Sequence, residues 1–190
     1  KLLRSSMQLL LQQAKDAKVV SRLTTVLLAI IKTDTLSARG ARNLTQGELG
    51  LLNGFDFNAN SPLSTTLSAP YSVGYDRATG VVGLELEAYN PHVQIAAPTG
   101  ATHYKLSCGA SELDFEEQTS LFKSVTTGIL PYQNSEVAAT TLEITLTAGS
   151  TLQIVHALSI EFYQEVNGTM YPLQNGAFNA MAVVQVAQPA

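Results

Sequence analysis

The sequence predicts an α+β protein in which N-terminal amphipathic helices precede an antiparallel β-sandwich of the immunoglobulin or fibronectin-III type. Apolar residues recur with a helical period before about residue 34 and alternate with polar residues after about residue 55. The charge is divided in the same way: residues 1–46 carry eight basic and two acidic residues (net +6), whereas residues 47–190 carry three basic and thirteen acidic residues (net −10). We therefore expect a basic helical segment over residues 1–46 and an acidic β-sandwich domain over residues 47–190.

The first 34 residues contain two sets of apolar residues, one spaced i, i+4, i+7, i+11 and the other i, i+3, i+7, i+10, and both spacings place a set along one face of a helix. Asp16 lies between the sets. It either caps a second helix or belongs to one long helix, because no Gly or Pro separates the sets. The candidate interface residues on this apolar stripe are Leu3, Met7, Leu10, Val20, Leu23, Leu27 and Ile30.

The apolar stripe has more than one interpretation. It either covers one end or edge of the β domain in the same chain, or packs against other copies as an assembly arm. The basic side chains would also neutralise phosphates, so nucleic acid is a further candidate partner. It is the weaker one, because the basic residues are spread over 42 positions without a cluster or interleaved aromatic residues. The apolar run over residues 26–31 is too short to span a membrane.

The segment between the two parts is expected to contain loops and one short helical turn. Thr33-Asp34-Thr35 ends the helical pattern, and Gly40 and Gly47 mark loops. Thr45-Gln46-Gly47-Glu48 has the spacing of a capping box, which predicts a helical turn over residues 49–52.

From Phe55 onward the period of two predicts about eight strands with one wet face each. Residues 76–80 form a hairpin loop, and Asn167-Gly168 is the strongest hairpin signal in the chain. The sequence lacks the Cys–Trp–Cys pattern of true immunoglobulin domains, so the comparison with them is architectural. The clearest alternating segments are residues 55–58, 81–87, 112–116, 142–146 and 152–162.

No catalytic or nucleotide-binding motif is present, and we expect a non-enzymatic protein without a metal or cofactor. The single cysteine, Cys108, excludes an internal disulfide. An odd separation places it on the strand face opposite His103, and we expect it to be buried beside Tyr104 and Leu106. His156 lies on an apolar strand face, which predicts a core histidine with a satisfied hydrogen bond.

An acidic ladder runs through Glu112, Asp114, Glu116 and Glu117. Carboxylates in this arrangement would suit a weak calcium site, because calcium prefers oxygen ligands. The alternative, which we favour, is a solvated strand face that blocks pairing between sheet edges. Glu85 and Glu87 are interpreted in the same way.

Several stretches, taken together, resemble an uncharacterised Bacteroidota protein family. They are Val20-Ser21-Arg22-Leu23-Thr24-Thr25, Ile31-Lys32-Thr33-Asp34, Ala38-Arg39-Gly40-Ala41-Arg42, Gly54-Phe55-Asp56-Phe57-Asn58, Ala97-Pro98-Thr99-Gly100-Ala101-Thr102-His103 and Phe162-Tyr163-Gln164-Glu165-Val166-Asn167-Gly168. The resemblance covers most of the chain. It implies a bacterial source, a helical stretch before a β-rich C-terminal half, and a basic segment rich in Gly and Lys upstream of Lys1. It assigns no catalytic or binding residue.

These features predict a structural or assembly protein that self-associates or joins a larger particle. The alternatives are a module that binds a glycan or protein ligand through loops at one end of the sandwich, and association with nucleic acid through the basic third. The tyrosines that would serve glycan stacking are Tyr71, Tyr75, Tyr89, Tyr132, Tyr163 and Tyr171.

Overall fold

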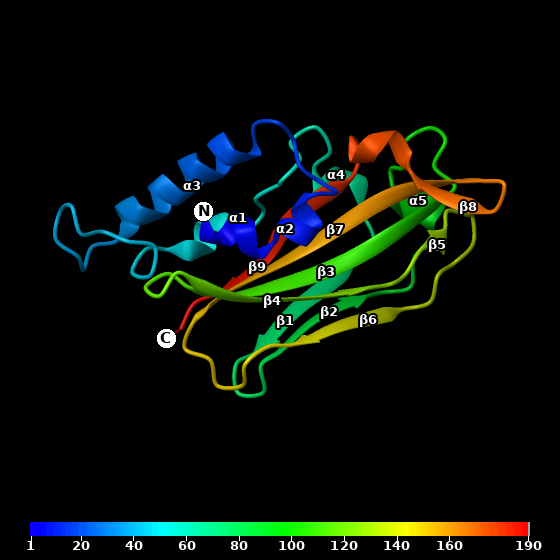
Figure 1. Ribbon diagram of the computed structural model, residues 1–190. Coiled ribbons are helices and arrows are strands. Elements are labelled where there is room, and N and C mark those ends of the chain that lie inside the picture. The colour runs from blue at the N-terminus through cyan, green and yellow to red at the C-terminus, as the bar shows by residue number, and fades with distance from the viewer. Residues whose placement is uncertain (190) are drawn as a thin grey trace.

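The computed structural model describes residues 1–189 and has three layers (Figure 1). Helices form the first layer, a six-stranded sheet forms the second, and a three-stranded sheet forms the third. All strand pairs in both sheets are antiparallel. The fold is therefore a sandwich-like α+β arrangement, with helices stacked on one outer face of the sandwich.

The apolar stripe forms three short helices: α1 (Leu2–Ser6), α2 (Gln8–Leu11) and α3 (Val19–Thr33). The alternative of one long helix is wrong, and Asp16 is part of the reason. Its carboxylate accepts hydrogen bonds from the backbone N–H groups of Lys18 (2.6 Å) and Ala59 (2.8 Å) and from the Arg22 guanidinium. Burial raises the pKa of Asp16, but these hydrogen bonds outweigh burial and hold it below its ordinary value.

The predicted helical turn is the 3-10 helix η1 (Leu49–Leu52). The predicted capping box does not form: the backbone N–H of Glu48 donates to the Thr33 hydroxyl at 2.7 Å. The end of α3 thus holds the start of η1. Asp34 directly follows α3, and its buried carboxylate accepts the backbone N–H groups of Leu36, Ser37 and Asn43. We call α1, α2, α3 and η1 with their connections, residues 1–52, the helical layer.

The larger sheet is built on two long central strands, β3 (His103–Asp114) and β7 (Gln153–Val166). β3 and β7 pair with each other along one edge, and each is long enough to pair with two shorter strands along its opposite edge. β3 pairs with β4 (Thr119–Thr126) and β5 (Leu130–Pro131), and β7 pairs with β8 (Thr169–Pro172) and β9 (Ala180–Ala187). The central register places Cys108 opposite Leu158.

The smaller sheet has the strand order β1-β2-β6. Its strands are β1 (Tyr71–Asp76), β2 (Val81–Leu86) and β6 (Thr140–Thr145). Three short helical turns lie in the connections: α4 (Leu63–Thr66), α5 (Pro91–Gln94) and η2 (Leu173–Gly176).

Both predicted hairpins are confirmed. Residues 76–80 connect β1 and β2, and Asn167 (φ 51°) and Gly168 (φ 77°) connect β7 and β8. A two-residue turn of this type requires positive φ at both positions, which Asn and Gly adopt readily. The expected strand at residues 55–58 is reduced to a single bridge between Asp56 and Ala182.

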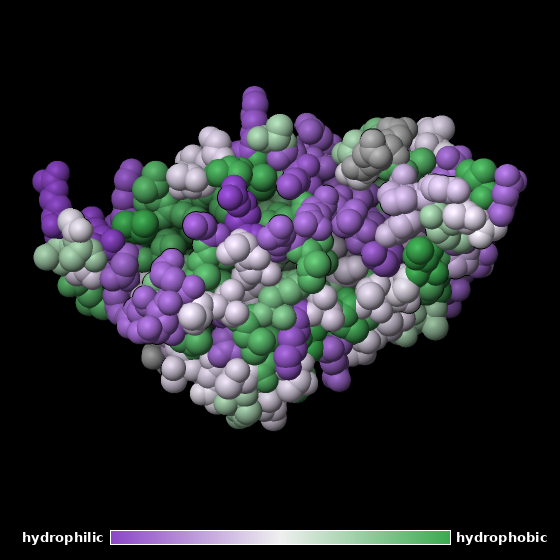
Figure 2. Space-filling view, viewed as in Figure 1, coloured by the Kyte–Doolittle hydropathy of each residue, from purple (hydrophilic) through white to green (hydrophobic). Residues whose placement is uncertain are grey.

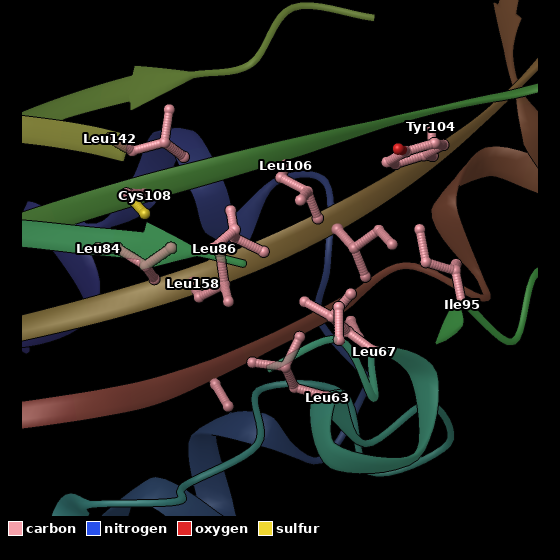
Figure 3. Close-up of a cluster of buried hydrophobic side chains, with 14 of the residues drawn as sticks. Leu63, Leu67, Leu84, Leu86, Ile95, Tyr104, Leu106, Cys108, Leu142 and Leu158 are labelled. Carbon is pink, nitrogen blue, oxygen red and sulfur yellow. The ribbon is translucent and has the colours of Figure 1, made fainter. Parts of the chain in front are cut away.

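The inner core lies between the two sheets (Figure 3). Leu84, Leu86 and Leu142 from the smaller sheet face Leu106 and Leu158 from the larger one. Leu63, Leu67 and Ile95 from the connections close one end. Alternation along each strand sends these side chains inward, and burial of apolar surface stabilises the fold by about 25 cal/mol per Å².

The outer core lies between the helical layer and the other face of the larger sheet. Its helical side consists of Leu3, Met7, Leu10, Leu11, Ala14, Val19, Leu23, Ile30, Leu49 and Leu52. Its sheet side consists of Leu113, Val155, Ala157, Met181 and Val183. The expectation of one wet face per strand is therefore wrong for β3 and β7, because the helices cover the face that would otherwise be solvated.

Gly109 on β3 allows the helical layer to approach the sheet. A Cβ atom at this position would lie 2.5 Å from Leu10 Cδ1 and 2.8 Å from Phe122 Cε2, well inside the usual carbon–carbon contact distance of about 3.5 Å. We expect Gly109→Val to displace α2 and to speed tryptic cleavage at Arg4 and Lys15. Gly74→Val is the control, because a Cβ there meets nothing within 4 Å. Equal cleavage rates in the two variants would contradict this account.

Candidate functional site

The structure places most of the candidate interface residues inside the outer core of the same chain. Leu3, Met7, Leu10, Leu23 and Ile30 are buried, and Leu27 is half-buried. Val20, the seventh candidate, is 47% exposed. The apolar stripe thus covers a face of the larger sheet, which agrees with the first of its interpretations. A surface available to a partner must lie on the opposite side of α3.

That outward side of α3 carries small hydroxyl side chains, one lysine and large apolar groups. Leu28 is 54% exposed, and Thr24, Thr25 and Lys32 surround it on the helix surface. Both threonine hydroxyls donate to carbonyl groups of the preceding helical turn. Leu9 and Leu51 are exposed on neighbouring segments of the helical layer. Figure 2 shows hydrophobic side chains at the surface in this region, bordered by hydrophilic ones.

Two hollows flank α3. The first has a volume of about 560 Å³ and lies between the N-terminal helices and α3. Its lining includes the cations Lys1, Arg4 and Lys15, and one acid, Asp16, whose carboxylate is already held by Arg22 and backbone N–H groups. The second hollow, of about 490 Å³, lies on the side of α3 that faces residues 51–62. α3 therefore forms a ridge between a basic hollow and a second, more open one.

Exposed cations gather in the helical layer, whereas the exposed acids other than Glu48 are spread over the rest of the chain, three of them on the smaller sheet. Seven cations in the helical layer are exposed: Lys1, Arg4, Lys15, Lys18, Lys32, Arg39 and Arg42. Lys123 is the one other exposed Lys or Arg among residues 1–189, because Arg77 and Lys105 are partly buried. On the smaller sheet, Asp76, Glu85 and Glu143 are exposed on the face turned away from the inner core.

A polar cluster lies on the larger sheet, on the same face as the helices. Lys105 Nζ is 3.0 Å from Glu161 Oε1, and the Tyr163 hydroxyl donates to Glu161 Oε2 at 2.8 Å. His103 Nε2 lies 3.9 Å from Glu165 Oε2. Burial lowers the pKa of Lys105, but its hydrogen bonds with Tyr163 and Glu161 outweigh burial and raise it. These groups satisfy one another, so the cluster behaves as an ion-pair network rather than as an activated nucleophile.

This cluster could not be predicted from the residues alone. Lys105 and Glu161 are directly opposite each other on β3 and β7, 56 residues apart in the chain. Detecting the pair requires the strand register, which alternation alone does not determine.

The structure confirms the predicted position of Cys108. It is fully buried in the inner core beside Leu106, on the strand face opposite His103. Burial raises the pKa of its thiol to about 12.

We expect a thiol reagent to modify native Cys108 at least about a hundredfold more slowly than the chain unfolded in denaturant, because reaction requires both opening of the fold and ionisation. Following the release of 2-nitro-5-thiobenzoate from 5,5′-dithiobis(2-nitrobenzoate) in both states measures this ratio. Similar rates in the two states would show that Cys108 is accessible.

His156 is buried in the inner core, as predicted. The predicted hydrogen bond of its ring is absent within residues 1–189. It is 1% exposed, and neither ring nitrogen has a hydrogen-bond partner among the described residues. Gln185 lies directly opposite on β9, beside a β-bulge. Burial lowers the pKa of His156 to about 4. The expectation of a satisfied core histidine is therefore wrong.

The residues of the acidic ladder lie in different environments. Glu112 faces the inner core and accepts hydrogen bonds from the Ser150 hydroxyl and from the Thr147 backbone N–H, so it is not solvated. Asp114 accepts the backbone N–H groups of Glu116 and Glu117 in the turn that follows β3. Within residues 1–189, no three His, Cys, Asp or Glu side chains come close enough together to hold a metal ion.

At the loop end of the sandwich, His92 and Tyr132 form an aromatic pair. Their ring centroids are 4.4 Å apart, and His92 lies on α5. The Asn90 side-chain amide donates to Asn134 Oδ1 at 2.8 Å beside them.

No helix within residues 1–189 is long and apolar enough to cross a membrane.

Comparisons with known proteins add little to this geometry. No protein-family model matches the chain, and no curated protein matches it. A solved structure from work on pH-induced modulation of Streptococcus parasanguinis adhesion by Fap1 fimbriae is 12% identical to it. That match covers 60% of this chain and 78% of the other, with a TM-score of 0.26. A likeness at this TM-score supports no argument about function.

Proposed function

We propose that the protein is a non-enzymatic assembly component that self-associates, or joins a larger particle, through the outer surface of its helical layer. The observation that carries this proposal is the α3 ridge. Its inner side is packed in the outer core, Val20 lines the first hollow, and its outer side presents Leu28. Exposed apolar groups gathered on one surface and rimmed by polar residues are typical of protein interfaces.

The energy of such an interface must come mainly from apolar contact. Exposed ion pairs contribute about 0–1 kcal/mol each, so the cations around α3 cannot hold an assembly by themselves. Burial of apolar surface contributes about 25 cal/mol per Å². The charges would instead accelerate association and select the partner.

Sedimentation velocity over a range of concentrations tests the proposal. We expect the wild type to exceed the monomer mass of 20.3 kDa as concentration rises, and Leu28→Glu to shift association to much higher concentration. Val93→Glu is the matched control, because Val93 is 75% exposed on α5, away from the helical layer. A wild type that stays monomeric at the highest concentration would contradict self-association.

The immunoglobulin or fibronectin-III type of the sandwich is part of the same proposal. Two antiparallel sheets around one apolar core support it. The helical layer would then be an addition to one outer face of that architecture.

A glycan-binding module is the second candidate, because the His92–Tyr132 pair lies beside the Asn90 and Asn134 amides. Aromatic rings and amide groups together suit sugar faces and hydroxyls. If this end binds glycans, Tyr132→Ala should weaken binding to a soluble polysaccharide by about fivefold, the equivalent of one lost aromatic contact. Tyr171→Ala, at an exposed tyrosine on β8, should leave it unchanged. Calorimetric titration of a polysaccharide panel measures both, and equal losses would exclude this end as the site.

A further inference from the structure

We propose that the basic helical layer of one copy docks on the acidic outer face of the smaller sheet of a second copy, so that copies join head to tail. This inference rests on the proposed function. It adds that the partner is a second copy of the chain and that the partner docks through its smaller sheet. Its starting point is the arrangement of the layers: the helices and the smaller sheet lie on opposite sides of the larger sheet (Figure 1).

The basic partner surface is the helical layer. Its exposed cations outnumber its one exposed acid, Glu48, by seven to one. Of its two other acids, Asp16 pairs with the Arg22 guanidinium, and Asp34 is buried after the end of α3. The α3 ridge and the basic hollow beside it are therefore open to an anionic surface.

The acidic partner surface is the outer face of the smaller sheet. Glu85 and Glu143 project from it on neighbouring strands, and β1, β2 and β6 contain no Lys or Arg. Gly74 and Gly83 are paired across β1 and β2 on this face, and a Cβ at either would meet nothing within 4 Å. The centre of the face is thus flat and open, with its carboxylates around it.

The two surfaces also match in shape. α3 presents Thr24, Thr25 and Leu28 along its ridge, and short side chains allow a helix to lie close to a flat sheet. A standard interface takes about 800 Å² from each partner, which is less than a tenth of the 9560 Å² surface of one chain.

Charge disfavours the symmetric alternative. Two helical layers packed face to face would bring their exposed cations together, and like charges across an interface cost several kcal/mol. Docking of opposite layers removes this repulsion. Because the two surfaces lie on opposite sides of the molecule, each docked copy leaves both kinds of surface free at the ends, and the assembly grows as an open chain.

Charge reversal on each surface tests the inference. The first variant, Lys18→Glu/Lys32→Glu, changes exposed cations at the two ends of α3, and the second, Glu85→Lys/Glu143→Lys, changes the sheet face. We expect each variant alone to associate at least about tenfold more weakly than the wild type. An equimolar mixture should regain association, because the new glutamates on α3 of the first variant meet the new lysines on the sheet of the second, and the intact surfaces of the two variants also match.

The matched control is Glu116→Lys/Glu117→Lys, which reverses two exposed acids in the turn between β3 and β4 and should leave association unchanged. Sedimentation velocity of the wild type, the three variants and the mixture provides the readout. Circular dichroism confirms that each variant is folded.

The outcomes separate the inference from the proposed function. If the wild type associates and the sheet variant associates equally well, the helical layer has another partner surface, and the head-to-tail inference is overturned while self-association stands. A monomeric wild type overturns both. If that monomer binds a random-sequence DNA duplex and the helical variant does not, the basic layer belongs to nucleic acid instead.

Discussion

Leu23→Glu is expected to unfold the protein. Leu23 is 5% exposed and lies on the inner side of α3, in the outer core. Loss of a buried leucine side chain alone costs about 2–5 kcal/mol, and a buried carboxylate without a partner adds to that cost. The sum approaches the whole stability of a typical domain, about 5–15 kcal/mol. Thermal denaturation followed by circular dichroism should show a large decrease in Tm or no cooperative transition.

The matched control lies on the same helix. Leu28 is 54% exposed on the outer side of α3, so Leu28→Glu should change stability by only about 0.5 kcal/mol. Replacement of the exposed Lys15 and Lys18 by Ala should have a similarly small effect on folding, since exposed charges contribute little. If Leu23→Glu melts like Leu28→Glu, the helices do not pack on the sheet as described.

Acidification from about pH 6.5 to about pH 4 is expected to destabilise the protein through His156. Its pKa in the folded protein is about 4, against an ordinary value of 6.5. Between these values the unfolded chain binds a proton that the folded protein excludes, so stability falls as the pH falls. A difference of this size corresponds to about 3 kcal/mol. Below about pH 4 both states are protonated and this contribution stops changing.

Urea denaturation at a series of pH values measures the effect. His156→Leu has no titrating group at this position, so its stability should be nearly level over the same pH range. His92→Leu is the control, because His92 is exposed and its loss should leave the pH dependence intact. The pKa of Asp16 and that of Asp34 are lowered from 3.8, so most of their contribution is lost below pH 4, and the part lost above it is shared by the wild type and His156→Leu. A wild-type stability that is level between pH 6.5 and 4 would contradict the account of His156.

The period of the apolar residues correctly predicted which segments are helices and which are strands, because this period depends on local spacing. The helical stripe, the hairpins at residues 76–80 and 167–168, and the strands at residues 81–87, 142–146 and 152–162 all appear in the structure. The covered outer face of β3 could not be predicted in this way. The residues on that face include Ser107, Gly109 and Ser111, a pattern typical of a solvated face. Ser111 is nevertheless buried, and it donates to the Ser6 hydroxyl at 3.0 Å. Small residues at these positions let helices approach, and only the three-dimensional arrangement distinguishes that role from solvation.

The charge separation shows the same limit. The sequence divides the basic and acidic residues along the chain, but it does not say that Glu85 and Glu143 face away from the helical layer. That follows from the layer order, with the helices and the smaller sheet on either side of the larger sheet. Glu112 illustrates the reverse error: it belongs to an acidic run, yet its side chain is buried against Ser150.

Hydrogen–deuterium exchange at low and high protein concentration tests the central claim most directly, which is that the inner side of α3 packs in the outer core of its own chain while its outer side meets another copy. In dilute protein we expect slow exchange in α3, comparable to that in β7 and β9. At high concentration, additional protection should appear in α3 and in the smaller sheet, and the β7–β8 hairpin should be unchanged. Exchange of α3 at the rate of an unfolded peptide in dilute protein, or no concentration dependence in either surface, would contradict the account.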